Sequence, residues 1–227
     1  MKLSRRQALM LATAHFCVAW SGSYAVAAEN VGTLEELSNE VWGTPVGAPR
    51  IALDEDGAIF KNEKLETGDD SAASVRFIDK SQLTLGANAH MVIDDYVYAG
   101  AASKSVFTLG RGAFRFVSGS MPEKNMQLRT PSVAIGIRGT ELKIDVYEDG
   151  STELSTIDGA AQVVSSFTSE VLDVVAGQSV LSDAKGIFLG GVRDFIHKSA
   201  DEAVERGLGE IRSRIPIPLP GIPNPFR

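Results

Sequence analysis

The chain has 227 residues, of which 44% are hydrophobic, and its 22 basic residues stand against 29 acidic ones, for a formal net charge of −7 at pH 7. This length is enough for one domain with a sizeable core. The acidic balance, without a compensating basic stripe, argues against nucleic-acid binding.

The first 28 residues have the pattern of an export signal. Lys2, Arg5 and Arg6 form a positive n-region, residues 8–20 are an apolar run, and the small residues that follow allow cleavage after Ala27 or Ala28. We predict that residues 1–28 are a cleavable signal peptide and that the mature protein is periplasmic or secreted.

Two alternatives concern the same segment. Residues 4–9, Ser-Arg-Arg-Gln-Ala-Leu, resemble a twin-arginine motif, so export of a folded protein and export by the general secretory route both remain open. The third hypothesis is an uncleaved membrane anchor, although the apolar core is shorter than the ~20 residues that a spanning helix needs.

The mature chain would contain no cysteine, because Cys17, the only one, lies in the leader. It would therefore form no disulfide and bind no metal through thiolate. Loss of Lys2, Arg5 and Arg6 leaves 19 basic residues against 29 acidic ones, which makes the mature charge about −10.

Short β-like segments dominate from about residue 64 to about residue 189, after a mixed segment rich in Gly and Pro turn signals. Apolar and polar residues alternate with the period of two that is typical of half-buried strands, and no strand–helix–strand alternation is visible. An all-β fold is therefore predicted. The alternating apolar residues are Val75 and Phe77, Leu83 and Leu85, Phe107 and Leu109, Phe114 and Phe116, and Leu142, Ile144 and Val146.

Residues 129–147 are the most informative stretch. They place Arg138 between Gly136 and Gly139 inside an otherwise apolar, β-prone segment. A charge in such surroundings is costly unless it is paired, and glycines let other backbone come close. A strand is predicted to follow over residues 141–147 and to end at the turn 148–151.

The order of motifs in this stretch resembles that of the FecR domain, the periplasmic module of the iron-dicitrate transport regulator and of many exported proteins. The family carries a Thr-Pro, a small and apolar run, an Arg-Gly-Thr before a strand, and then an Asp-Gly turn. The matching positions are Thr130-Pro131, residues 134–137, Arg138-Gly139-Thr140 and Asp149-Gly150. Further pieces that fit in order are residues 65–69, 73–77, 82–86 with Asn88, 112–117 and 175–178.

The resemblance covers residues 41–185 and implies a compact stack of short strands, similar to a β-solenoid or a sandwich. One departure is Lys80, which stands in the turn 79–81 where the family favours glycine. The binding or structural candidates that the resemblance implies are Arg138, Gly136, Gly139, Thr140, Thr130 and Pro131.

Two hypotheses fit Arg138. It could contact the carboxylate of a ligand such as citrate, or an acidic side chain of a partner. It could instead be a buried structural residue that holds adjacent strands through carbonyls and an acid. The apolar flanks and the glycine frame favour the buried role, which predicts that Arg138→Ala destabilises the fold strongly.

The end of the chain follows a different pattern. Gly190-Gly191 is predicted to end the strands, and residues 190–215 are predicted to contain an amphipathic helix. Its apolar stripe comprises Val192, Phe195, Ile196, Ser199, Ala203, Leu208, Ile211 and Ile215. Residues 216–227 are proline-rich and expected to be extended, either as a disordered or core-hugging tail or as a docking segment.

Little in the sequence points to catalysis, a cofactor or a metal. The mature chain has two histidines, His90 and His197, far apart in sequence. The acid pairs Asp69-Asp70 and Asp94-Asp95 would point to opposite faces of a strand. Residues 54–57 are most simply a turn, and a calcium site there remains open.

We therefore expect a non-enzymatic, exported module that acts by protein–protein contact in the cell envelope, as a signalling accessory or scaffold. The expected partner is an envelope or outer-membrane protein, with membrane contact only through an uncleaved signal or the C-terminal segment. A signal peptide stands where the family's regulator has a cytoplasmic segment and a membrane helix, so anti-sigma activity is not expected.

Two rival functions remain. A periplasmic small-ligand or glycan binder would need a concave apolar pocket. An enzyme with carboxylate chemistry would need Asp94 or Asp95 to face another acid across a cleft. The aromatic candidates for a binding surface are Trp42, Tyr96 and Tyr98, whereas Phe77, Phe114 and Phe116 are predicted to be core.

Overall fold

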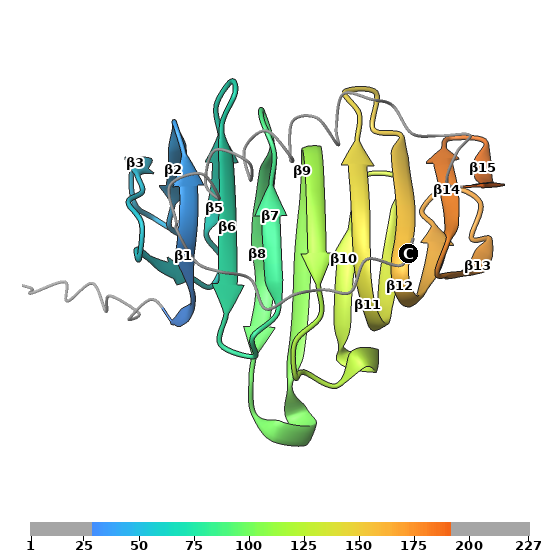
Figure 1. Ribbon diagram of the computed structural model, residues 1–227, viewed down its shortest axis with the longest axis horizontal. Helices are drawn as coiled ribbons and strands as arrows, with labels where there is room; N and C mark the ends of the chain where they lie inside the picture. The colour runs from blue at the N-terminus through green and yellow to red at the C-terminus, as the bar shows by residue number, and fades with distance from the viewer. Residues whose placement is uncertain (1–28, 192–227) are drawn as a thin grey trace, which may run out of the picture.

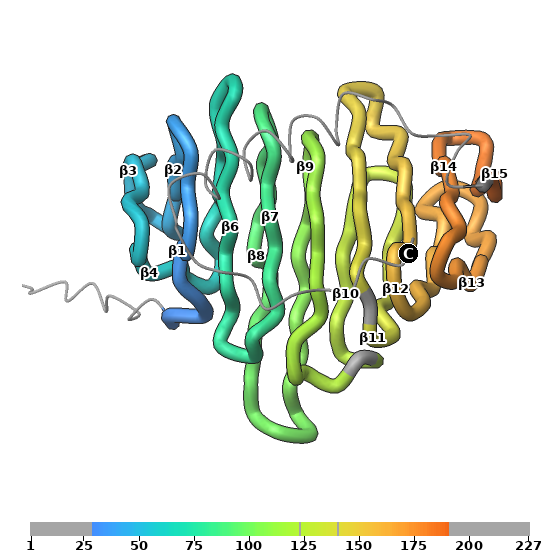
Figure 2. Tube along the Cα trace, viewed as in Figure 1, coloured from blue at the N-terminus to red at the C-terminus, as the bar shows by residue number. Residues whose placement is uncertain are grey.

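The computed structural model describes residues 29–191, and in this part the chain is all-β, as predicted (Figures 1 and 2). Fifteen strands belong to one continuous sheet, with two short 3₁₀ turns, η1 (Gly100–Ala102) and η2 (Glu123–Asn125). No helix in this part of the chain is long and apolar enough to cross a membrane. The predicted signal peptide, proline-rich segment and nearly all of the predicted helix lie outside the described residues.

The strands are β1 (Asn30–Ser38), β2 (Val41–Thr44), β3 (Ile51–Ala52), β4 (Ala58–Phe60), β5 (Lys64–Thr67), β6 (Ala72–Phe77), β7 (Gln82–Leu85), β8 (His90–Val97), β9 (Lys104–Val117), β10 (Met126–Arg129), β11 (Val133–Val146), β12 (Thr152–Ser165), β13 (Val171–Val175), β14 (Gln178–Asp183) and β15 (Gly186–Gly191).

The sheet folds back on itself into two layers. The front layer, which faces the viewer in Figure 1, has the strand order β4-β1-β6-β7-β9-β11-β12-β14-β15. The back layer has the order β3-β2-β5-β8-β9-β10-β11-β12-β13. All neighbours are antiparallel except β9 and β10.

Three strands of 14 residues each, β9, β11 and β12, belong to both layers. Each of them contains a glycine with positive φ where it leaves one layer for the other: Gly112 (φ 113°), Gly139 (φ 59°) and Gly159 (φ 73°). Residues with a Cβ rarely adopt this backbone conformation. The crossing points therefore depend on glycine, and we call them the three corners.

The core lies between the two layers and forms one cluster. Val75 and Phe116 of the front layer and Met91 and Ile135 of the back layer all point into it and are fully buried. The predicted core residues Phe77, Phe114 and Phe116, and the alternating residues Leu142, Ile144 and Val146, are confirmed.

The structure shows the conformation of two predicted turns and of the predicted strand end at Gly190-Gly191. Lys80, where the family favours glycine, takes up φ 69°, so a lysine here adopts the glycine-like conformation. The predicted turn before β12 is present, with Tyr147 N donating to Ser151 O at 2.9 Å. Gly190 and Gly191 still pair within β15 and are its last two residues.

A buried carboxylate ties together the connections at one rim of the stack. Asp79 is fully buried, and its Oδ1 accepts hydrogen bonds from Ser81 N (3.1 Å), Ser81 Oγ (2.6 Å) and Tyr96 Oη (2.8 Å). Its Oδ2 accepts from Met121 N at 3.3 Å. Burial and the neighbouring carboxylate raise the pKa of the Tyr96 hydroxyl, so this group stays protonated as a donor.

The backbone of Asp79 completes this cage. Its carbonyl oxygen accepts from Ser120 N at 2.7 Å and from Ser120 Oγ at 2.8 Å. A Cβ on Gly119 would collide with that oxygen, so the close approach requires glycine. Three segments distant in sequence, residues 79–81, β8 and residues 119–121, are joined by one side chain.

We expect Asp79→Ala to lower the free energy of unfolding by at least about 3 kcal/mol, because it leaves several buried donors without an acceptor. Tyr96→Phe removes one donor and should cost about 1 kcal/mol. Asp54→Ala, in an exposed turn, is the control and should change stability by no more than about 0.5 kcal/mol. Urea denaturation measures all three, and a loss below about 1 kcal/mol for Asp79→Ala would contradict the role of the cage.

A second prediction separates corner glycines from other glycines. Gly112→Ala should cost at least about 2 kcal/mol, because φ is positive there and the new Cβ would collide with Ala89. Gly136→Ala should be neutral or stabilise by about 0.5 kcal/mol, because the new Cβ would lie 3.8 Å from its nearest neighbour, Gln162 O. Thermal denaturation of the pair tests this, and equal melting temperatures would refute the corner assignment.

Candidate interaction surface

The Arg-Gly-Thr motif forms the corner of β11. The pairing of β11 with β12 is interrupted between Arg138 and Glu141, where the strand passes from the back layer to the front layer. Gly139 supplies the positive φ of this corner, and Thr140, whose side chain is not described, follows it. The glycine of the motif is therefore explained by the backbone conformation that the corner requires.

Arg138 is exposed, and the prediction of a buried structural arginine is wrong. Its side chain is 51% exposed and forms an ion pair from Nη1 to Oδ1 of Asp173 at 3.5 Å, and the Asp173 side chain is itself 56% exposed. The reason is the strand period: Ile135 and Ile137 point into the core, so Arg138 points out. Such a surface pair contributes no more than about 1 kcal/mol to stability.

Gly136, Thr130 and Pro131 lie in three different local environments. No backbone approaches Gly136 closely, contrary to the expectation for the glycine frame. Thr130 is buried in the connection from β10 to β11, where its Oγ1 accepts from Val133 N at 3.1 Å and from Thr152 Oγ1 at 2.7 Å. Pro131 is exposed beside Gly150. The six candidates thus do not converge on one pocket.

Arg138 lies instead on a broad outward surface of the back layer, which we call the β13 face. Val171 and Val175 are 58% and 49% exposed on the edge strand β13, with Asp173 between them. In the register of the sheet Arg138 pairs with Ala160, and Ala160 pairs with Val175. The small side chain of Ala160 therefore lies between the larger side chains of Arg138 and Val175. The β13 face consists of Ala134, Gly136, Arg138, Ala160, Gln162, Val164, Val171, Asp173 and Val175.

Exposed apolar side chains gather at this end of the described chain. Of the ten exposed large hydrophobic residues, six lie between positions 157 and 189, on or beside the last strands. Among the strands of residues 29–191, β13 pairs only with β12 and β15 only with β14, so both are edges of the described sheet. Apolar exposure beside unpaired strand edges is typical of a protein contact rather than of a free surface. The six residues are Ile157, Phe167, Val171, Val175, Phe188 and Leu189.

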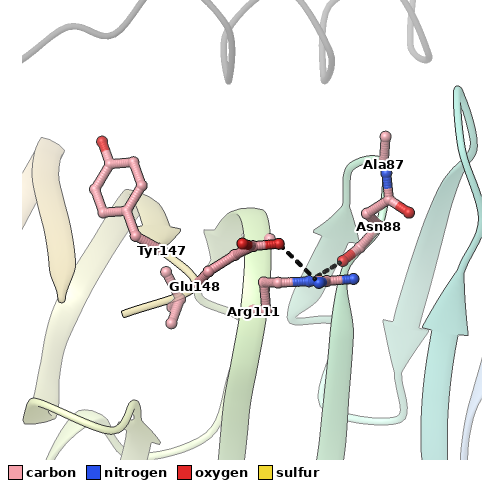
Figure 3. Close-up of a pocket in the computed structure, with 7 residues that line it drawn as sticks. Ala87, Asn88, Arg111, Tyr147 and Glu148 are labelled. Atoms are coloured by element: carbon pink, nitrogen blue, oxygen red, sulfur yellow. Dashed lines mark hydrogen bonds and ion pairs between the residues drawn. The ribbon is translucent and has the colours of Figure 1, made fainter. Parts of the chain in front are cut away.

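The stack also has a shallow depression of about 380 Å³ at the rim where the β9 corner lies (Figure 3). Arg111 crosses it, donating from Nε to Asn88 O at 3.2 Å and pairing through Nη1 with Glu148 Oε1 at 3.1 Å. The only aromatic residue of the lining is Tyr147. The depression is open and mainly polar, and so differs from the concave apolar pocket that a ligand binder would need.

The candidate catalytic acids Asp94 and Asp95 lie next to solvent or to lysines. Asp95 pairs with Lys61 at 2.7 Å and with Lys104 at 3.3 Å, and the bond to Lys61 is the main cause of its lowered pKa. Asp94 is exposed. Burial raises the pKa of Glu63, whose Oε2 accepts from Phe60 N at 2.8 Å.

Residues 29–191 contain no group of three or more His, Cys, Asp or Glu that could hold a metal ion. His90 is half-buried at the start of β8, as the sequence predicts for its position in a strand. Burial lowers the pKa of His90, which favours the neutral ring.

The aromatic surface candidates divide in the structure. Tyr96 is fully buried in the Asp79 cage, so its prediction as a surface residue is wrong. Tyr98 is 44% exposed and hydrogen-bonded to Ser120 at 2.9 Å. Trp42 is half-buried, with the Arg50 guanidinium 3.8 Å from its ring centre. They do not form a common aromatic platform.

Comparison with known proteins bears on this architecture. Residues 63–162 match the family model described as FecR protein. The chain contains a FecR domain. The family is regulatory rather than enzymatic, which agrees with the resemblance found in the sequence. No curated protein matches the chain significantly.

Two crystal structures of a proposed anti-sigma factor from Parabacteroides distasonis, at 2.50 Å and 1.65 Å resolution, are similar to this chain. Each is 15% identical with a TM-score of 0.47, and the match covers 61% of this chain and 61% of that chain. The similar region therefore spans less than two thirds of the anti-sigma factor.

The FecR match ends within β12, so it includes Arg138 and excludes β13 and β15. The β13 face is thus built partly from the FecR domain and partly from the segment that follows it. The exposure of Val171 and Val175 was not expected from the sequence, because in the run Val-Leu-Asp-Val-Val apolar residues occupy both faces of the strand and alternation does not mark the outward one.

The sequence predicts that removal of the Arg138 side chain strongly destabilises the fold. Because Arg138 is exposed in the structure, we now expect only a small effect on stability. Arg138→Ala should change the free energy of unfolding by less than about 1 kcal/mol, because only a solvent-exposed ion pair is lost. Urea denaturation beside Asp79→Ala as the destabilised reference measures this. A loss comparable to that of Asp79→Ala would restore the structural role.

Proposed function

We propose that this protein is an exported, non-enzymatic FecR-type module that acts by protein–protein contact in the cell envelope, as a signalling accessory or scaffold. The contact is made through the β13 face. The observation that carries the proposal is the coincidence of Arg138, at the corner of the FecR domain, with exposed valines on an unpaired edge strand.

The composition of the β13 face suits a protein partner. Arg138 is held by one long ion pair to an exposed acid, so a partner carboxylate can replace Asp173 at little cost. Val171 and Val175 add apolar area that would leave water on contact. A central arginine flanked by apolar residues is a composition enriched at interfaces.

Export is the second part of the proposal. It rests on the n-region, apolar run and small residues of positions 1–28, and on the absence of cysteine after position 17, which makes folding independent of the redox state of the compartment. An envelope protein is then the partner that the module would meet.

The proposal predicts a position-dependent crosslink in intact cells that express the full chain. A photo-crosslinking amino acid at Val171 should give a discrete adduct with another protein, whereas the same group at Ile51, which is 48% exposed at the opposite end, should not. Arg138→Glu should reduce the Val171 adduct by about tenfold, as the loss of a favourable charge contact costs 1–2 kcal/mol. Lys80→Glu, also exposed, is the matched charge control.

Cell fractionation of the same samples shows in which cell compartment the crosslinked adduct is found. An adduct in the envelope fraction, lost with Arg138→Glu and kept with Lys80→Glu, is the expected result. Equal adducts from Val171 and Ile51, or none from Val171, would overturn the proposed surface.

A further inference from the structure

Four strands of the described sheet pair with a single neighbour, namely β3, β4, β13 and β15. β3 and β4 have two and three residues, and three of the six residues of β15 are glycines, which weaken strand pairing. β13 has the sequence Val-Leu-Asp-Val-Val, without the lysine, proline or bulge that commonly blocks a strand edge. Its three valines favour strand pairing, so the edge of β13, at one end of the stack in Figure 1, is the best suited to a further strand.

The hydrogen bonds between β12 and β13 show which backbone groups face this open edge. Ala176 N donates to Gly159 O at 3.0 Å, in continuation of the register of the two strands. In an antiparallel pair, residues that bond the neighbouring strand alternate with residues whose N–H and C=O point the other way. The residues of β13 that turn their backbone groups toward the open edge are therefore Val171, Asp173 and Val175.

One of these groups is occupied by the chain itself. Val175 N donates to Gln178 Oε1 at 3.0 Å, which agrees with an amide that points away from β12. Within residues 29–191, no backbone hydrogen bond to another strand is formed on this side of Val171 or Asp173. A neighbouring strand would therefore pair with these two residues and end beside Gln178.

We propose that the partner in the β13 contact adds a strand of its own to the sheet, hydrogen-bonded to the backbone of Val171 and Asp173. The inference rests on the proposed function and deepens it, because it names the form of the partner segment at the same surface. In such an arrangement the backbone hydrogen bonds supply affinity, and side chains at alternate positions supply selectivity.

The side chains of β13 predict the pattern of the added strand. Val171, Asp173 and Val175 share the outward face, where directly opposite side chains of neighbouring strands are in contact. Asp173 Oδ1 accepts from Gln162 Nε2 at 3.2 Å and pairs with Arg138, and a carboxylate can accept further hydrogen bonds. The partner strand therefore carries a lysine or arginine opposite Asp173, with apolar residues two positions before and two positions after it.

A second copy of this chain fits the edge poorly. Two β13 strands paired by two-fold symmetry about Asp173 would place this carboxylate opposite its own copy, and like charges directly opposite each other destabilise a sheet. A shift of the symmetry centre by one residue in either direction would place Asp173 opposite a valine. The expected mature charge of about −10 adds a general repulsion between copies. The occupant is therefore a different protein.

Proline substitutions in the full chain test the free backbone donor. Asp173→Pro removes an N–H that faces the open edge, so its urea midpoint should stay close to that of Asp173→Ala. Leu172→Pro removes an N–H that pairs with β12 and should lower the midpoint clearly. A midpoint for Asp173→Pro as low as that of Leu172→Pro would contradict the assignment of the donor and overturn the inference.

The photo-crosslink from Val171 in intact cells measures the contact in the same variants. We expect Asp173→Pro to give at least about tenfold less adduct than Asp173→Ala, because it loses a hydrogen bond and sets a proline ring against the added strand. Asp173→Lys should also give less adduct than Asp173→Ala, because it opposes the basic residue of the partner strand.

The outcomes separate the added strand from the proposed function. Equal adducts from Asp173→Pro and Asp173→Ala would refute the strand and leave the contact through the β13 face standing, whereas no adduct from Val171 in the unaltered chain would refute both. An adduct with a second copy, or a crosslink within one chain, would overturn the inference and identify that occupant of the edge. More adduct from Asp173→Lys than from Asp173→Ala would rule out the predicted basic residue.

Discussion

A stack of two layers that share strands needs a sharp change of direction inside each shared strand. β9, β11 and β12 satisfy this need with Gly112, Gly139 and Gly159, whose positive φ is strained for residues with a Cβ. Because these strands run from one layer into the other, side chains of both layers pack into a single core. The remaining short strands then extend the two layers in both directions from the shared strands.

The corners also explain where charges appear in apolar segments. Arg111, Arg138 and Asp158 each stand immediately before a corner glycine, at the edge of a layer. At that position the strand is leaving the core, so a charged side chain can point into water. Arg138 pairs with Asp173 of β13, so this corner, which lies inside the FecR match, stands beside a strand that lies outside it.

Asp79 shows the opposite arrangement, a carboxylate that is fully buried. Asp79 is surrounded by donors from three segments, and each donor would be left unsatisfied without it. This cage holds one rim of the stack together. At the end formed by β13 and β15 the polar contacts are exposed, and they lie beside exposed apolar side chains such as Val171 and Val175.

Local alternation determined much of this protein in advance: the strands around residues 75–77, 83–85, 114–116 and 142–146, the all-β class, and the order of motifs that resembles the FecR domain. These signals are short-range, because a strand's inward and outward faces follow from a period of two. The same period, applied to Val133, Ile135 and Ile137, already places Arg138 outward, whereas the apolar flanks of Arg138 by themselves favour burial. Only the tertiary structure decided that Tyr96 is buried, because its hydroxyl is held by Asp79, 17 residues away in sequence. Likewise, only the pairing of β11, β12 and β13 brings Arg138 beside Asp173 and Val175, since register between strands depends on long-range contacts that no local pattern specifies.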